Sequence, residues 1–135
     1  MGKNYIDIEN EYGDTLRYRK HVNGRGLIAH GAKVHPTALV EAGAYVEPGA
    51  QVAAGAHIGR GVWIEPDAVI GVEVEIAPHA HIGTGAAIGA RAKIGVRTFV
   101  GANARVAMGS LIGDDESIAD GERVATDPRG LRLAA

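Results

Sequence analysis

The sequence of 135 residues contains no cysteine, which excludes disulfide bonds and any chemistry that depends on a thiol. It also lacks an apolar run long enough to span a membrane, and its polar N-terminus does not resemble a secretion signal. Charge of one sign is not in excess either. The 14 basic and 16 acidic residues leave a formal net charge of −2, which argues against nucleic acid as an obligatory partner. These absences favour a cytoplasmic protein with neither a membrane nor a nucleic-acid partner.

A strict period of six is the dominant feature that the sequence does have. From Ile28 to Val124 every sixth residue is isoleucine or valine, seventeen times in succession. Two positions before most of these residues stands a small residue, usually alanine, and glycine is common three positions after them. Because about one residue in five of this stretch is Ile or Val, chance would give such a run with a probability on the order of 10⁻¹². The stretch is therefore a repeat.

A period of six fits neither an α-helix nor a simple alternating strand. It arises when a short strand places one small and one large side chain inward, with an outward residue between them, and a tight turn follows. The pattern resembles the left-handed parallel β-helix of hexapeptide-repeat proteins, in which three hexapeptides form one triangular coil. The resemblance implies an all-β fold with a single-stranded, left-handed β-helix. Seventeen repeats at three per coil predict about 5.7 coils.

We expect all 135 residues to form one domain with three parts. Residues 1–27 contain two alternating segments, NYIDIEN and TLRYRKHV, which predict an N-terminal β-hairpin or strand pair that covers one end of the solenoid. Residues 28–124 form the β-helix without any insertion, and residues 125–135 form a C-terminal tail. Near the end, Glu116 and Glu122 occupy the small inward position. Because buried carboxylates are costly, the last coil is predicted to be open, frayed or covered by a neighbour.

Outward residues eighteen apart stack above one another in successive coils, about 4.8 Å apart. Past residue 27 the sequence has only three aromatic residues, and all three fall in one outward column together with a histidine: Tyr45, Trp63, His81 and Phe99. An outward aromatic column favours a contact that covers it. We predict that this column is the interface of a homotrimer, the usual assembly of hexapeptide-repeat proteins. A different partner or ligand, or plain exposed stacking, are the alternatives.

A second outward column contains His57, Glu75 and Lys93. Its side chains alternate in polarity, as favourable cross-strand pairs do. The column is either a solvated face or the place of a catalytic histidine that Glu75 orients.

Residues 35–46, HPTALVEAGAYV, resemble the opening repeats of sugar and lipid-A-type acyltransferases and of nucleotide-sugar N-acetyltransferases. The resemblance implies a histidine that acts as general base on an acceptor hydroxyl or amine, and an acyl donor, coenzyme A or acetyl-CoA, in the groove between subunits. We select His79, in a turn, as this base. Arg91, Lys93 and Arg97 are predicted to lie with it along one edge and to bind the phosphates of the donor. The acceptor loop of many such enzymes is missing.

Residues 28–35, IAHGAKVH, resemble the paired-histidine stretch of γ-class carbonic anhydrases. The resemblance implies that His30 and His35 match two of that family's three zinc ligands, and that a neighbouring subunit would supply the third. The only histidine expected at the same level along the solenoid axis, from which a neighbouring subunit could supply this third ligand, is His21. Isolated turn histidines are the simpler interpretation, so no metal site is assigned.

Three functions follow from these features. The first is a hexapeptide acyltransferase-like protein whose acyl-CoA donor binds in grooves between the subunits of a trimer and whose small-molecule acceptor is not identified. The second is a non-catalytic trimeric scaffold or binding module. The third is a zinc hydratase similar to γ-class carbonic anhydrases. Acyl transfer is the leading enzymatic hypothesis.

Overall fold

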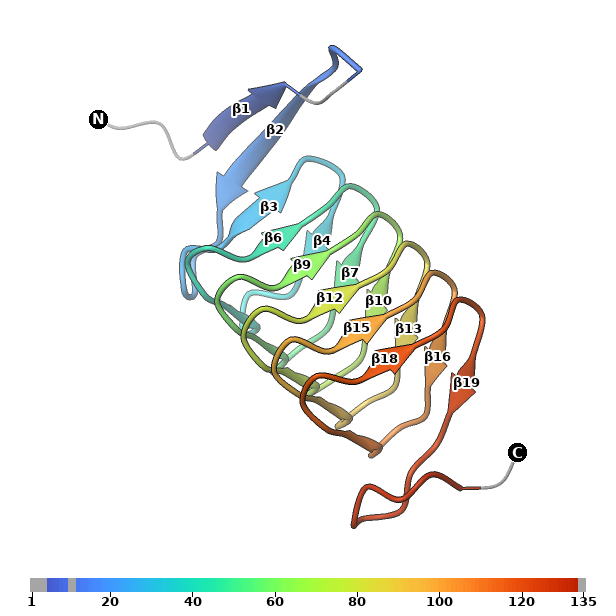
Figure 1. Ribbon diagram of the computed structural model, residues 1–135. Coiled ribbons are helices and arrows are strands. Elements are labelled where there is room, and N and C mark those ends of the chain that lie inside the picture. The colour runs from blue at the N-terminus through green and yellow to red at the C-terminus, as the bar shows by residue number, and fades with distance from the viewer. Residues whose placement is uncertain (1–4, 10–11, 134–135) are drawn as a thin grey trace.

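The computed structural model of the chain describes residues 5–9 and 12–133. This part of the chain contains nineteen strands and no helix, and hence no helix that could cross a membrane (Figure 1). The predicted all-β fold is confirmed.

The N-terminal part of the chain forms the predicted hairpin. β1 (Tyr5–Glu9) and β2 (Thr15–Lys20) pair antiparallel. β2 also pairs antiparallel with β3 (Leu27–Ala29), so the hairpin extends the first sheet of the solenoid. In Figure 1 the hairpin projects beyond the first coil.

From β3 onward, each coil contributes one short strand to each of three parallel sheets. The first sheet contains the hairpin, β3, β6 (Tyr45–Val46), β9 (Trp63–Ile64), β12 (His81–Ile82), β15 (Phe99–Val100) and β18 (Ser117–Ile118). The second contains β4 (Lys33–Val34), β7 (Gln51–Val52), β10 (Val69–Ile70), β13 (Ala87–Ile88), β16 (Arg105–Val106) and β19 (Arg123–Val124). The third contains β5 (Leu39–Val40), β8 (His57–Ile58), β11 (Glu75–Ile76), β14 (Lys93–Ile94) and β17 (Leu111–Ile112).

These sheets are the three faces of a triangular prism, and the chain passes through them in this order in every coil. The coils advance with the left hand that the resemblance implied (Figure 1). Residues eighteen apart are paired in register, as Glu75 is with both His57 and Lys93. Three edges separate the faces, and each turn of the chain lies on one of them.

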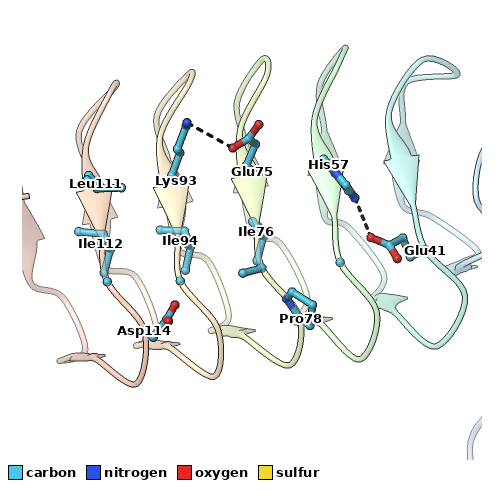
Figure 2. Close-up of a pocket in the computed structure, with 14 residues that line it drawn as sticks. Glu41, His57, Glu75, Ile76, Pro78, Lys93, Ile94, Leu111, Ile112 and Asp114 are labelled. Atoms are coloured by element: carbon cyan, nitrogen blue, oxygen red, sulfur yellow. Dashed lines mark hydrogen bonds and ion pairs between the residues drawn. The ribbon is translucent and has the colours of Figure 1, made fainter. Parts of the chain in front are cut away.

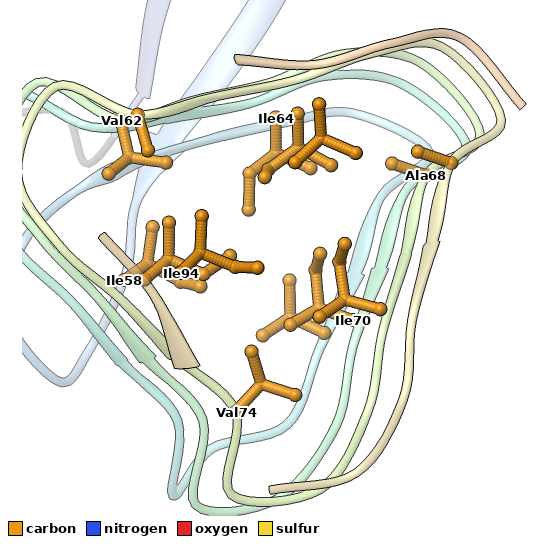
Figure 3. Close-up of a cluster of buried hydrophobic side chains, with 14 of the residues drawn as sticks. Ile58, Val62, Ile64, Ala68, Ile70, Val74 and Ile94 are labelled. Atoms are coloured by element: carbon orange, nitrogen blue, oxygen red, sulfur yellow. The ribbon is translucent and has the colours of Figure 1, made fainter. Parts of the chain in front are cut away.

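The core consists of the repeated inward positions. Ile58, Ile76 and Ile94 stack in register inside the prism and are at most 2% exposed. Figure 3 shows rows of such side chains that fill the interior of the coils. β-branched side chains suit these positions because their stiff rotamers pack well on a pleated surface. The predicted core pattern is therefore confirmed.

The C-terminal coil is open, which was one of the predicted alternatives, but its strands are not frayed. It contains β18 and β19 and adds no strand to the third sheet, so Glu116 is exposed and Glu122 is partly exposed. Ile118 is fully buried, and β18 and β19 are paired with the preceding coil. Arg132 of the chain's own tail reaches both carboxylates: its guanidinium lies 2.8 Å from Glu122 and 3.8 Å from Glu116.

The opposite end of the prism is closed by the segment that joins β2 to β3. His21 in this segment is 2% exposed, and its Nε2 bonds to the backbone oxygen of Ala38 over 2.8 Å. The Nδ1 atom of the same ring is buried without a hydrogen-bond partner among the described residues.

Candidate active site

His79 lies in the turn between β11 and β12, on the edge where the third sheet meets the first. Its φ of 65° is in the left-handed region, where a side chain costs about 1–2 kcal/mol. The imidazole lies over Gly61, one coil earlier, since a Cβ atom on Gly61 would come within 2.2 Å of His79 Nδ1. The His79 side chain is exposed and has no hydrogen bond to another residue in the described ranges. It is therefore free to approach a substrate.

Arg97 occupies the equivalent turn position one coil after His79. Its Nε and Nη2 atoms donate hydrogen bonds to the two carboxylate oxygens of Asp115, over 2.7 and 2.9 Å. These hydrogen bonds lower the pKa of Asp115 and raise the pKa of Arg97. The guanidinium is thus directed to the C-terminal coils, and a phosphate group would compete with Asp115 for it.

Lys93 and Arg91 do not lie on the edge that carries His79. Lys93 is in the middle of the third sheet, on β14, with its Nζ 3.6 Å from Glu75 Oε2. Arg91 belongs to the preceding turn, on the edge between the second and third sheets. The expectation of a single-edge cluster is therefore corrected. Only turn residues eighteen apart share an edge, whereas Arg91 and Arg97 are six apart.

A shallow groove of about 560 Å³ runs along the third sheet (Figure 2). It contains the Lys93–Glu75 pair and a second pair, in which His57 Nε2 donates to Glu41 Oε2 over 2.7 Å. Glu75 therefore does not orient His57, as one interpretation of the sequence had it. The carboxylate of Glu41, which follows β5, reaches the histidine instead.

The aromatic column forms the outer surface of the first sheet. The exposed fractions of Tyr45, Trp63 and Phe99 are 36, 44 and 39%. The His81 ring stacks on Trp63, with 4.7 Å between ring centroids, and meets Phe99 edge to face at 4.9 Å. At the other end of the column, Tyr18 of the hairpin stands perpendicular to Tyr45. The predicted column exists, and the hairpin extends it.

His81 is also held by a carboxylate, which sequence reasoning missed. Its Nε2 bonds to Glu65 Oε2 over 2.5 Å, and Thr84 donates to the other oxygen of Glu65. A histidine fixed in this way by a carboxylate is one known arrangement for a general base. The side chain of His81 is only 28% exposed, however, so its ring is less accessible than that of His79.

A spacing of sixteen residues connects all three outward carboxylate pairs of this kind. Glu41 bonds to His57, Glu47 to Trp63 and Glu65 to His81. Each glutamate is the residue directly after a strand, and its carboxylate reaches the first residue of the next strand in the same sheet. This offset, two residues short of a full coil, is the sequence signal that would have revealed the pairs.

The histidines considered for zinc do not form a ligand cluster. Within the described ranges, no group of three or more His, Cys, Asp or Glu side chains is arranged to hold a metal ion. His35 is bonded through Nδ1 to Thr37, and His21 is buried against Ala38. His30 is exposed.

Comparisons with known proteins give matches only among solved structures, because no protein-family model and no curated protein sequence matches the chain. A histidine-to-asparagine mutant of perosamine N-acetyltransferase from Caulobacter crescentus, in complex with CoA and GDP-perosamine, is 30% identical over 74% of this chain, with a TM-score of 0.73. The match covers 48% of that protein, so this chain spans about half of its length.

Two further structures share the fold at lower identity. A hexapeptide transferase family protein from Anaplasma phagocytophilum is 18% identical, with 79% of this chain and 76% of that chain covered and a TM-score of 0.56. Serine acetyltransferase from Neisseria gonorrhoeae, in complex with serine, is 19% identical, with 77% and 42% covered and a TM-score of 0.52.

Proposed function

Because the chain is a left-handed hexapeptide-repeat β-helix similar to acetyltransferases, we propose that it is an acyltransferase that takes its acyl group from coenzyme A. The observation that carries this proposal is the similarity to perosamine N-acetyltransferase, which extends over 74% of the chain and whose structure contains CoA. The structure of serine acetyltransferase shares the fold. The acceptor is a hydroxyl or an amine of a small molecule.

His79 is the proposed general base. It takes the proton from the acceptor while the acceptor oxygen or nitrogen attacks the thioester carbonyl. The tetrahedral intermediate then expels coenzyme A as its thiolate, which is reprotonated, and the acyl group remains on the acceptor. Exposure and the absence of a competing partner favour His79, whereas the Nε2 of His81 is already bonded to Glu65.

Arg97, Lys93 and Arg91 are the proposed contacts to the phosphates of the donor. Arg97 lies on the same prism edge as His79, and its guanidinium would bind a phosphate oxygen in place of Asp115. The Lys93 ammonium group would likewise bind phosphate in place of Glu75. Arg91, on the far edge of the third sheet, can reach only a donor that extends across that face. Because Arg97 and Lys93 give up a carboxylate partner, the gain from each of these contacts is the difference between the phosphate and carboxylate ion pairs.

We further propose that the chain forms a homotrimer with the donor in the grooves between subunits. The aromatic column supports this assembly, because three exposed aromatic side chains in one row favour burial against a second prism. Tyr45, Trp63, His81 and Phe99 are the proposed interface residues.

The test combines donor binding with turnover. Calorimetry should detect coenzyme A binding to the wild-type protein and weaker binding to Arg97→Ala. With acetyl-CoA and a panel of amino and hydroxyl acceptors, His79→Ala should lose turnover but keep donor binding. His81→Ala is the matched control, and if it alone loses turnover, the base is His81. Absence of binding at millimolar coenzyme A would refute the proposal.

The second candidate function is a non-catalytic binding module. It is favoured by the regularity of the solenoid, because the coils between β3 and β19 have no insertion from which an acceptor loop could project. This function predicts an intact oligomer that neither binds coenzyme A nor consumes acetyl-CoA.

A further inference from the structure

A hollow of about 450 Å³ lies between the N-terminal hairpin and the first sheet. We refer to it as the hairpin hollow. Its lining includes Ile8, Tyr18, Tyr45, Glu47, Gly61 and Trp63. The volume is within the range of small-molecule sites, and three of the eight lining residues are aromatic.

Three rings form the walls of the hairpin hollow. Tyr18 and Tyr45 stand perpendicular to each other, with ring centroids 5.7 Å apart. Trp63 is on the next strand of the same sheet and is 44% exposed, so part of its surface is open to a ligand. Gly61 also lines the hollow, and the His79 imidazole lies over it. Tyr18 is 3% exposed, so Tyr45 and Trp63 provide the aromatic surface that a ligand can reach.

Glu47 places a carboxylate in this aromatic surround. Its Oε1 accepts a hydrogen bond of 2.5 Å from the Tyr18 hydroxyl, and its Oε2 accepts one of 2.8 Å from the Trp63 indole. Both donors are neutral, and they fix the carboxylate without cancelling its charge. Burial, followed by the hydrogen bond and charge of Glu47, raises the pKa of the Tyr18 phenol, as expected beside an unneutralised anion.

Among the described residues, no Lys or Arg forms an ion pair with Glu47. Lys, Arg and His are absent from the lining of the hairpin hollow, and Glu47 has no ion-pair partner in the described part of the chain. This distinguishes Glu47 from Glu41 and Glu65, each of which faces a histidine. The hollow is therefore complementary in charge to a cation and unfavourable for an anion.

We infer that the hairpin hollow binds an organic ammonium ion, with its positive charge against Tyr45, Trp63 and the carboxylate of Glu47. Aromatic faces attract an ammonium group by about 0.5–1 kcal/mol when exposed and by about 2 kcal/mol when desolvated. The carboxylate adds a charge-assisted contact. The inference does not rest on the proposed acyl transfer, because it does not involve coenzyme A. It requires Tyr45 and Trp63 to be accessible, so cation binding and the proposed trimer interface are competing uses of this end of the aromatic column.

The test uses the fluorescence of Trp63, which is the only tryptophan of the chain and lies in the hollow. The full-length protein is titrated with choline and, separately, with its neutral carbon isostere, in which a tert-butyl group replaces the trimethylammonium group. Broadening of the choline methyl signal in NMR spectra gives a second readout. The variants are Glu47→Gln, which keeps the shape of the side chain, and Tyr45→Leu. Val69→Ala, an exposed position on the second sheet and outside the hollow, is the control.

The inference predicts saturable choline binding that is about tenfold or more tighter than that of the isostere. Glu47→Gln and Tyr45→Leu should each weaken choline binding about tenfold. Val69→Ala should leave it unchanged, and all variants should keep the wild-type circular dichroism. Equal affinity for the isostere, undiminished binding by Glu47→Gln, or no saturable signal in either readout would overturn it. None of these outcomes depends on coenzyme A binding, so the proposed acyl transfer stands or falls separately.

Discussion

Acidification should loosen the N-terminal end of the solenoid through His21. Burial of its ring lowers the pKa of His21, and the nearby Arg19 acts in the same direction, while the bond to the Ala38 oxygen opposes the shift. The Nδ1 atom that would take up a proton is buried without a partner among the described residues. Protonation would therefore place an uncompensated charge in the end of the prism.

The direction of this pH effect follows from the number of protons that the folded and unfolded states bind. In the unfolded chain His21 titrates near its ordinary pKa of about 6.5. In the folded chain His21 remains neutral to a lower pH. Below its ordinary pKa the unfolded state therefore binds more protons than the folded state, and the free energy of unfolding decreases as the pH decreases. One such proton gives a slope of at most about 1.4 kcal/mol per pH unit. The lowered pKa values of Asp115 and Asp127 act in the same direction, but only at a pH below about 4.

Urea unfolding between about pH 7.5 and about pH 5 measures this effect. The variant His21→Gln can still donate a hydrogen bond to the Ala38 oxygen but does not titrate, so its stability should depend less on pH than that of the wild type. His30→Gln, an exposed histidine at the same end, should keep the wild-type dependence. If His21→Gln and the wild type lose stability in parallel, His21 is not the group that titrates, and the reasoning is refuted.

Other predictions concern the core, the tail and the assembly. Ile76→Ala should lower the free energy of unfolding by about 2–5 kcal/mol in urea melts, since the side chain is 2% exposed in the middle of the stack; a loss under 1 kcal/mol, which is about the value of a surface contact, would contradict this. Arg132→Ala should cost only about 0.2–1 kcal/mol, because the ion pairs with Glu116 and Glu122 are partly exposed. A larger loss in the same assay would mean that the tail holds the last coil together. Phe99→Glu should dissociate the proposed trimer in sedimentation velocity, and a variant that stays trimeric would place the interface elsewhere.

The fold was predictable from the sequence because one local rule repeats. Each hexapeptide has the same inward pair of side chains and the same turn. Stacking every third repeat therefore buries the inward side chains and pairs the backbone of all repeats in the same way. Ile58, Ile76 and Ile94 were predicted to stack from spacing alone and do so. The open last coil was also among the predicted alternatives, but the contact of its glutamates with Arg132 was not, because the tail lies outside the repeat.

The candidate site was predictable only in part, because its chemistry depends on side-chain direction. The period gives the face or edge of each residue, as it did for His79 and the aromatic column. It does not say that Arg97 turns to Asp115, or that Glu41 reaches His57 from the preceding coil. Long side chains cross from one coil to the next, and their rotamers are set by local competition for partners.

The regularity of the solenoid also limits where its function can be. Between β3 and β19 the coils have no projecting loop, so only outward strand residues and turn residues can meet a ligand. The inward positions are used by the core, and the backbone is used by the sheets. Some of the charged outward groups already have a partner of opposite charge, such as Lys93 with Glu75 and Arg97 with Asp115. A ligand that binds one of these groups must compete with its present partner. The side chain of His79 has no hydrogen bond among the described residues, and the Glu47 carboxylate has only neutral donors, so neither has to break an ion pair before it meets a ligand.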